Sequence, residues 1–400
     1  MTISHWMSRL KVVAGIAHGS RAFGGPLQLS LSLTNRCNLR CVHCYFYSPF
    51  LDRPNMRPLR LSRQDGATVL SRGELEKMQR IDADSEHTAA ILDEALEMGV
   101  RRVQFSGNGE CFLHKNVLDL MRRARAVGAF CVANTNGTLI DRAAADELIR
   151  MQFDELRVTL MAGTREMYGR THPGARDDLF ERVCENLLYL KERKRTLGVD
   201  RPVVKPVCIV VDQNCDGLLD FAKLSVELGA EAVLYKPVDD LGDESMLPLV
   251  PTPEHADLAK RQLAESRAVL ELAGVKHNID AFLRAFGGRL DTAAVYRMIP
   301  CTYGWLACVI EPTGQVYSCC RCYEPIGNAY ETSFRAVWNS ERYRRFRSEA
   351  GRLNRGGKPE QGCECKRCVH HEANFKAFKV LHPWKARKTA SALRFPGLGE

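Results

Sequence analysis

The chain has 400 residues, of which 45% are hydrophobic and 26% charged, and its 57 Lys and Arg exceed its 48 Asp and Glu to give a net charge of +9. This composition is typical of a globular protein long enough for one large domain and a smaller one, and no run of eighteen apolar residues predicts a membrane span. Its sixteen cysteines, without a signal-peptide core in the first 25 residues, indicate metal ligation in a reducing cytoplasm rather than disulfides.

The first predicted strand leads into a dense group of cysteines. Apolar and polar residues alternate from Leu27 to Leu33, and Cys37, Cys41 and Cys44 follow. Three thiolates can ligate three irons of a four-iron cluster, which leaves one iron open to take part in chemistry. A zinc knuckle or a group of buried free thiols is the alternative, but zinc usually takes four closed ligands and no fourth cysteine follows nearby.

Helix and strand patterns alternate beyond an irregular, Pro- and Arg-rich stretch (48–84) that contains a short predicted helix near its end. Strands are predicted at 103–106, 130–133, 155–160, 203–211 and 232–235, and helices at 88–98, 117–127, 142–151, 179–197 and 218–228. This alternation predicts an α/β fold in which helices wrap a parallel sheet, either open or closed into a barrel. In such folds, ligands bind at the carboxyl ends of the strands.

Unusual motifs follow the predicted strands at 103–106 and 130–133, where that rule places a ligand. Gly107 and Gly109 would let the backbone come close to a ligand, and the carboxylate of Glu110 could accept hydrogen bonds from an ammonium group. The strand predicted at 130–133 is followed by Asn134 and Asn136. These residues either contact a ligand or form a plain Asn-Gly turn.

A second group of candidate metal ligands lies near the C-terminus, where eight cysteines fall from Cys301 to Cys368. Residues 309–317 predict a hairpin whose turn contains Pro and Gly, with a cysteine on each side. A helix is predicted from residue 333 past Phe346, and a Cys-x2-Cys clip follows it. A hairpin flanked by thiols can bring two metal ligands together.

The Cys-x3-Cys-x2-Cys spacing resembles that of the radical S-adenosylmethionine (SAM) enzymes, and the likeness extends over residues 27–370. The resemblance implies a partial (β/α)6-type barrel and a SAM molecule chelated to the open iron. Cys111 and Met161 replace a Pro and an Asp that are usual in this family. By the same resemblance, the residues expected to bind SAM are His43, Gly107, Gly109, Glu110, Asn134 and Asn136.

The C-terminal cysteines, with Gly327-Asn328 and the Trp-Asn-Ser sequence at Trp338, resemble the SPASM domain or the shorter twitch domain of radical SAM proteins, a small α+β module. No cysteine follows Cys368, which implies one auxiliary four-iron cluster, and a zinc ribbon is the alternative. Cys308 is a hydrogen donor to a substrate radical or a small core residue. The expected ligands are Cys301, Cys319, Cys365 and Cys368, while three spare thiols leave the assignment open: Cys320, Cys322 and Cys363.

We therefore expect five parts: an N-terminal lead (1–26), a radical SAM partial barrel (27–240), a helical linker (241–300), an auxiliary cluster domain (301–370) and a basic C-terminal tail (371–400). The tail is either a solvated face or a surface for an anionic substrate or partner.

The resemblance implies an oxidoreductase that cleaves SAM to a 5′-deoxyadenosyl radical and abstracts a substrate hydrogen. The expected substrate is a small polar metabolite such as a sugar or aminocyclitol. The alternatives are a peptide- or protein-modifying maturase and a non-enzymatic iron–sulfur or zinc-binding protein. We expect an external electron donor such as flavodoxin or ferredoxin, no nucleic-acid partner and a cytoplasmic location.

Overall fold

The computed structural model of the chain describes residues 3–49, 72–239, 244–286, 292–359, 362–363, 365 and 368–393. Most of the irregular stretch predicted for residues 48–84 lies outside the described residues. Its later part contains helix α2 (Arg72–Met78), which confirms the short helix predicted there. No helix among the described parts of the chain is long and apolar enough to cross a membrane.

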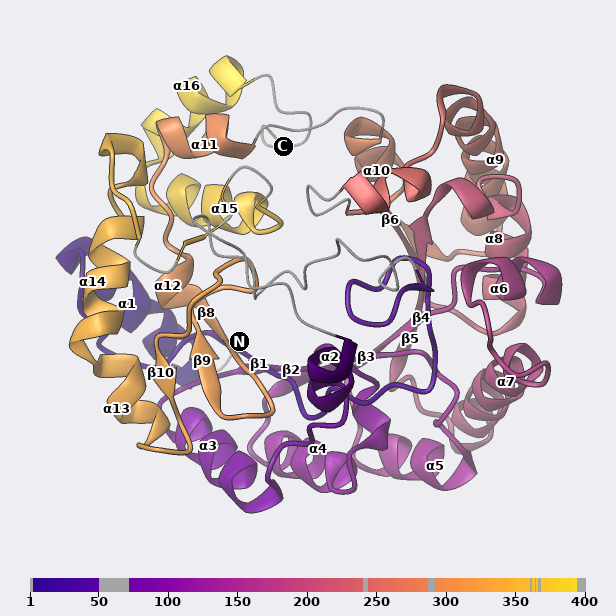
Figure 1. Ribbon diagram of the computed structural model, residues 1–400, viewed down its shortest axis with the longest axis horizontal. Coiled ribbons are helices and arrows are strands. Elements are labelled where there is room, and N and C mark those ends of the chain that lie inside the picture. The colour runs from indigo at the N-terminus through magenta and orange to yellow at the C-terminus, as the bar shows by residue number, and fades with distance from the viewer. Residues whose placement is uncertain are drawn as a thin grey trace.

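The described residues form a ten-stranded sheet in the order β10-β9-β8-β1-β2-β3-β4-β5-β6-β7. Pairing is parallel from β8 through to β7, and the sheet curves without closing (Figure 1), which confirms the predicted partial barrel. The strands that follow one another along the chain are β1 (Gln28–Leu31), β2 (Arg102–Phe105), β3 (Phe130–Thr135), β4 (Glu155–Thr159), β5 (Val203–Val210), β6 (Ala232–Pro237) and β7 (Lys276–His277).

The helices between these strands cover the outer face of the sheet (Figure 1) and match the predicted helices to within their end turns. They are α3 (Ser85–Glu97), α4 (Val117–Ala126), α5 (Arg142–Arg150), α7 (Leu179–Leu197) and α8 (Leu218–Glu227). The apolar pattern did not indicate α6 (Arg165–Thr171), which follows β4. The remaining helices of the first 300 residues are α1 (Ile3–His18), α9 (Pro253–Leu272), α10 (Ile279–Ala285) and α11 (Thr292–Met298).

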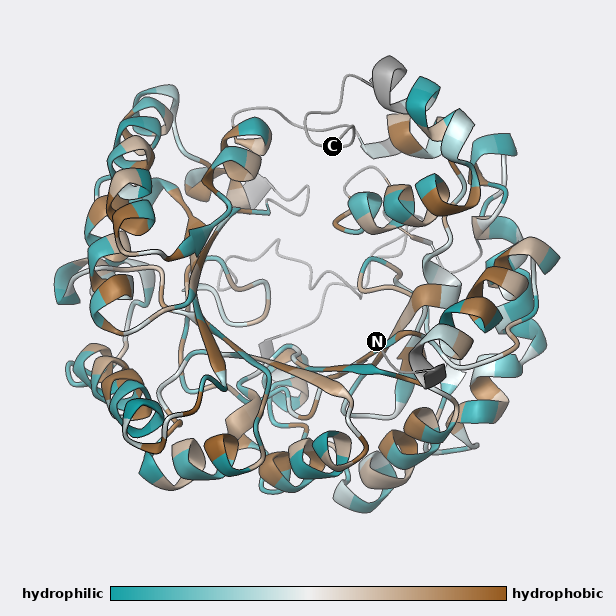
Figure 2. Cartoon of the chain, turned by 180° about the vertical axis from the view of Figure 1, so that it is seen from behind, coloured by the Kyte–Doolittle hydropathy of each residue, from teal (hydrophilic) through white to brown (hydrophobic). Residues whose placement is uncertain are grey.

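Local sequence explains where these helices begin and which side they bury. The side chains of Asp84, Asp141 and Thr164 accept hydrogen bonds from backbone N–H groups in the first turns of α3, α5 and α6. Hydrophobic and hydrophilic residues alternate in bands along the outer helices (Figure 2), and their apolar sides pack with alternate strand residues such as Leu29 and Leu31 in one core. The main core therefore lies between the sheet and its surrounding helices.

The opposite, inner face of the sheet carries polar side chains. Strand residues alternate between the two faces, so the neighbours of core residues point inward. Several of these inward residues are partly exposed, unlike those of a closed barrel, whose interior is filled. They include Gln28, Ser30, Gln104, Asn134, Arg157, Lys205 and Lys236.

The C-terminal region continues the same sheet. Strand β8 (Ala307–Ile310) pairs in parallel with β1 and forms the predicted hairpin with β9 (Gln315–Tyr317), beyond which lies β10 (Gly327–Asn328). Gly314 adopts a left-handed conformation in the hairpin turn, with φ of +80°. Cys308 lies opposite Leu29 and is fully buried in the core, which supports a packing role for it.

Helical structure extends further toward the C-terminus than we expected. The single helix predicted past Phe346 is divided into α13 (Phe334–Asn339) and α14 (Glu341–Ala350), because Ser340 is extended and its side chain caps the second helix. The segment expected to be a basic tail forms α15 (His371–Leu381) and α16 (Pro383–Leu393). Apolar residues of these two helices pack against α11 in a small second core: Val295, Ile299, Phe375, Phe378 and Ala386.

We predict that stability falls as the pH is lowered because of His172, at the end of α6. This side chain is fully buried and stacked on Tyr168, and its Nε2 has no hydrogen-bond partner among the described residues. Burial, and secondarily the nearby His43, lower its pKa to about 3. The unfolded chain therefore binds a proton near pH 6.5 that the folded chain does not, so stability is full above that pH and declines as pH falls toward 3.

The expected slope from this one residue is about 1.4 kcal/mol per pH unit below about pH 6.5. His172→Phe keeps the stacking and removes the titration, so urea unfolding measured at about pH 7.5 and about pH 5.5 should show a smaller loss in the variant. An identical loss in both proteins would contradict the assignment.

Candidate functional site

The cysteine loop after β1 is held on several sides. Its backbone turns where the Cys44 N–H donates to the Cys41 carbonyl at 3.0 Å, and the Val42 N–H donates to the Thr171 carbonyl of α6 at 3.0 Å. The hydroxyl of Ser48 is buried and donates to the Val42 carbonyl at 2.7 Å. These bonds fix the loop at the carboxyl end of the sheet, as the strand pattern predicted.

Burial raises the pKa of all three thiols in this loop, to about 12 for Cys37. Ionisation of Cys44 or Cys37, in the same loop, raises the pKa of Cys41 further. The thiols are therefore protonated at neutral pH until a cation binds, and cluster binding must release protons. Three half-buried thiols in one loop fit the ligands of a four-iron cluster in which three irons are bound by the protein and one is open.

The glycines after β2 are required by packing against the cysteine loop. A Cβ at Gly107 would lie 1.9 Å from the Ser32 hydroxyl, and one at Gly109 would lie 2.2 Å from the Arg36 carbonyl oxygen. Next to them, the Glu110 N–H donates to that same Arg36 carbonyl at 2.8 Å. The glycines make room for the segment that carries the cysteines, and their predicted approach to SAM stays a prediction.

The carboxylate of Glu110 joins two loops. It is 3% exposed and accepts hydrogen bonds from the Phe112 N–H at 3.1 Å, the Thr135 hydroxyl at 2.8 Å and the Asn136 N–H at 2.6 Å. Burial raises its pKa, while these donors favour the ionised form. Its remaining lone pairs could accept from an ammonium group, and that contact with SAM stays a prediction.

The two asparagines after β3 have different surroundings. Asn136 is satisfied within the chain, since its Nδ2 donates to Asn38 Oδ1 at 2.8 Å and its Oδ1 accepts from the backbone of Thr138 at 3.0 Å. Asn134 donates to the Ser106 hydroxyl at 2.9 Å, but its buried Oδ1 has no partner among the described residues. Asn134 is therefore the better candidate for a ligand contact, while Asn136 fits the turn interpretation.

His43 lies between two of the cysteines and presents an unsatisfied nitrogen. Its Nδ1 is buried and has no hydrogen-bond partner among the described residues. Burial and, second, the positive charge of Lys236 lower its pKa to about 4, so the ring is neutral at neutral pH. Lys236, at the end of β6, was missed by sequence reasoning. Its position directly after the apolar residues of that strand was the one usable signal.

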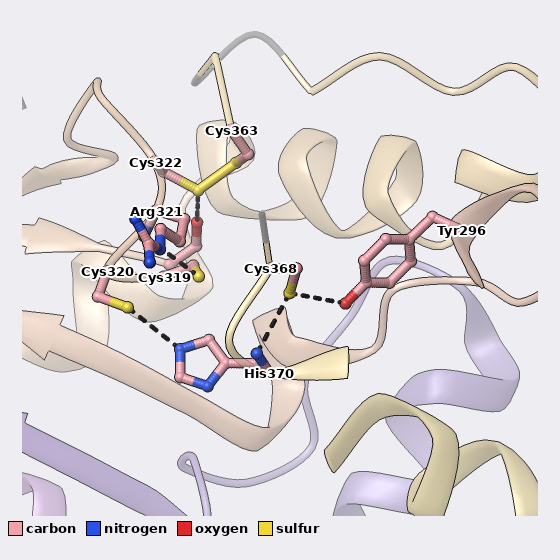
Figure 3. Close-up of a disulfide and its surroundings, with 9 residues drawn as sticks. Tyr296, Cys319, Cys320, Arg321, Cys322, Cys363, Cys368 and His370 are labelled. Atoms are coloured by element: carbon pink, nitrogen blue, oxygen red, sulfur yellow. Dashed lines mark hydrogen bonds between the residues drawn. A yellow bond between two sulfur atoms is a disulfide. The ribbon is translucent and has the colours of Figure 1, made fainter. Parts of the chain in front are cut away.

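The four predicted auxiliary ligands come together around one pocket. Cys301, Cys319, Cys365 and Cys368 line it together with aromatic side chains. In Figure 3 the Cys368 sulfur lies beside the Tyr296 hydroxyl, 2.9 Å away, and the His370 N–H donates to it at 3.3 Å. The charges of Cys368 and Cys365 add to burial in raising the pKa of Cys301, which again indicates neighbouring sulfurs.

Of the three spare thiols, Cys363 lines the same pocket. Contrary to the expectation of metal ligation rather than disulfides, Cys322 and Cys363 are joined in a disulfide (Figure 3). The Cys320 sulfur lies 3.2 Å from Nε2 of His370. The sulfurs of Cys319 and Cys320 and a ring nitrogen of His370 all lie within 4.8 Å of one another. His370 was missed by sequence reasoning, although its position two residues after a Cys-x2-Cys clip was a usable signal.

Comparison with known proteins assigns the family. Residues 31–207 match the radical SAM superfamily, and residues 301–369 match SPASM, an iron–sulfur cluster-binding domain. The chain is a radical SAM enzyme with a SPASM domain. The predicted cofactors, SAM and iron–sulfur clusters, are thereby confirmed, whereas the residues assigned to bind them stay predictions. The unsatisfied Asn134 Oδ1 and His43 Nδ1, together with two groups of neighbouring thiols, fit these cofactors.

Individual relatives agree with this membership at low identity. The antilisterial bacteriocin subtilosin biosynthesis protein AlbA of Bacillus subtilis is 25% identical over 80% of this chain, and the match spans 61% of AlbA. The PqqA peptide cyclase of Bradyrhizobium diazoefficiens is 25% identical over 89% of this chain and 82% of its own length. The crystal structure of Streptococcus suis SuiB bound to SAM shares the fold of this radical SAM enzyme, with a TM-score of 0.56 at 16% identity over 84% of this chain and 70% of SuiB.

We predict that Gly109→Ala disrupts the SAM-domain site. The added Cβ meets backbone on the cysteine loop rather than a flexible side chain, so we expect a loss of about 1–3 kcal/mol of stability and a lower iron content after reconstitution. Gly169→Ala in α6 is the matched control, because its Cβ meets nothing within 4 Å. Urea unfolding and iron analysis report the result, and equal behaviour of the two variants would refute the packing argument.

We also predict the iron content of the anaerobically reconstituted enzyme. Two four-iron clusters give about eight irons per chain, and the Cys37/Cys41/Cys44→Ala variant should keep about four. Cys322→Ser should leave the count unchanged, as should Cys184→Ser on the outer helix α7. Four irons with one zinc would instead show a zinc ribbon, and about twelve would show that spare thiols build a further cluster.

Proposed function

We propose that this radical SAM enzyme modifies a peptide or a protein. The observation that carries the proposal is that relatives aligned over most of the chain are named for peptide substrates and products, among them the PqqA peptide cyclase and the subtilosin biosynthesis protein. SuiB, which shares the fold, has also been crystallised with its precursor peptide SuiA. These names favour the maturase alternative over the small polar metabolite that we first expected.

The shape of the sheet supports a polypeptide substrate. The sheet does not close into a full barrel, so its two edge strands stay apart (Figure 1). Several inward side chains of β1 to β6 are polar and partly exposed, among them Gln28, Asn134 and Lys236, so they can hydrogen-bond an extended chain. A peptide is long enough to use such a surface, whereas a sugar would contact only a small part of it.

Each group of residues has a defined part in this proposal. The thiolates of Cys37, Cys41 and Cys44 hold the cluster whose open iron binds SAM. When bound, these cofactors supply the 5′-deoxyadenosyl radical that abstracts a substrate hydrogen. Glu110 orders the loops around the site. With SAM bound, its carboxylate would accept from the SAM ammonium, and the buried Asn134 Oδ1, which has no partner among the described residues, would accept a further hydrogen bond.

The SPASM domain completes the proposal with an electron-transfer site. Cys301, Cys319, Cys365 and Cys368 provide four thiolates, which close all the irons of one auxiliary cluster and leave none open for a substrate. A closed cluster suits electron transfer. We further propose that a flavodoxin or ferredoxin supplies the electron that starts the reaction.

Deuterium transfer tests the substrate class directly, because the label in 5′-deoxyadenosine reports whichever molecule in a mixture gives up a hydrogen. The reconstituted enzyme is incubated with SAM, a reductant and a lysate of its own organism grown in deuterated medium, separated by dialysis into retained and dialysable fractions. We expect 5′-deoxyadenosine to gain deuterium from the retained fraction, and protease treatment of that fraction to abolish the gain.

The Cys37/Cys41/Cys44→Ala variant is the control and should form no 5′-deoxyadenosine. Deuterium that comes from the dialysable fraction and resists protease would establish a small metabolite as the substrate instead. Failure of the wild-type enzyme to cleave SAM at all would refute the radical mechanism itself.

A further inference from the structure

The inner face of the sheet carries an excess of positive charge. Arg102, Arg157, Lys205 and Lys236 all alternate with core residues on their strands and therefore point inward. Arg102 lies over the ring of Phe130, 4.6 Å from its centroid. Among the described residues of β2 to β6, these four cations share the inner face with one carboxylate, that of Glu155.

That single carboxylate is already engaged twice. Glu155 accepts from Arg157 Nε at 2.5 Å and from Lys205 Nζ at 2.9 Å. The register places Arg157 beside Lys205, so one negative charge is shared by two neighbouring cations. Positive charge thus remains uncompensated on this part of the sheet.

Lys236 has no anionic partner among the described residues. Its amine makes no hydrogen bond or ion pair with them, and its charge acts on His43, the ring next to Cys44. The side chain reaches solvent, yet the surrounding atoms and the charge of Arg157 lower its pKa. Lys236 has access to water, its neighbours are neutral or positive, and it has no partner among the described residues. An anion that binds beside it would therefore stabilise its charged form.

The cations are spread along the strands in a way that suits an extended peptide. Lys236 lies opposite Ile209, four residues beyond Lys205 on β5. Four strand residues span about 13 Å, so the backbone positions that carry the two amines are well separated along the sheet. An extended peptide places side chains of one face about 7 Å apart, so its acidic residues can reach successive cations.

We propose that Lys236, together with Arg157 and Lys205, forms a subsite that binds the carboxylate side chains of an acidic peptide substrate on the inner face of the sheet. This inference rests on the proposed function, since it names the chemical class of the peptide that the enzyme modifies. The subsite extends from Arg157 on β4 and Lys205 on β5 to Lys236 near the end of β6, whose charge acts on His43 of the cysteine loop.

A fluorescent hexaglutamate peptide is the probe, and hexaglutamine is its neutral counterpart. The reconstituted enzyme should bind hexaglutamate and not hexaglutamine. Lys236→Gln should weaken hexaglutamate binding by about tenfold, because one charge-assisted contact is lost. Lys236 makes no hydrogen bond or ion pair with the described residues, so this substitution removes no such contact on which folding depends.

Lys260→Gln is the matched control. This lysine lies on the outer helix α9, paired with Asp257 at 2.8 Å, and its substitution removes the same charge from the chain. Hexaglutamate affinity should be unchanged in this variant. An equal loss in both variants would show general attraction to a basic protein, and no loss in Lys236→Gln would show that the amine binds no peptide; either result overturns the proposal.

A loss of SAM affinity in Lys236→Gln, without a loss of hexaglutamate affinity, would assign the amine to the cofactor and also overturn it. The proposed function is tested separately. A wild-type enzyme that binds hexaglutamate but transfers deuterium from small metabolites would refute the proposed function alone, whereas deuterium transfer from a proteinaceous fraction without hexaglutamate binding would refute only the acidic subsite.

Discussion

Three loops meet at the carboxyl ends of β1, β2 and β3, and the geometry of the candidate site depends on the contacts of Glu110 between them. Its N–H donates to the loop that carries Cys37, while its carboxylate accepts from the loop after β3. A buried carboxylate is tolerated because three donors of the chain satisfy it. The same requirement leaves no room for a side chain at Gly107 or Gly109, so the glycines and the acid form one structural unit.

The loops are also tied to the SPASM domain. Tyr45, next to Cys44, donates to Asn108 at 2.7 Å, and Asn108 donates to Glu311 at the end of β8 at 3.0 Å. Strand β8 pairs with β1, so both cysteine groups are attached to one sheet. A continuous sheet holds the two groups at a fixed separation, which is the condition that electron transfer between two clusters requires.

The sequence predicted the elements whose residues interact locally. The strands and their helices followed from alternation and helical periodicity, and the cysteine loop followed from spacing alone. The pairing of β8 with β1 could not be predicted, because the two strands have four residues each and lie far apart along the chain, so no local pattern links them. His370 and Lys236 were missed for a related reason, since their meaning depends on neighbours that only the fold brings close.

The two cysteine groups and the cationic inner face converge on the end of β6. Arg321, beside Cys320 and Cys322, forms an ion pair with Asp239, three residues beyond Lys236. On the opposite side, Lys236 acts electrostatically on His43 beside Cys44. A peptide held by Lys236 would therefore lie between the SAM-domain cysteines and the loop that supplies the auxiliary ligands. Under the proposed function, this position would allow a substrate to lose its hydrogen on one side and its electron on the other.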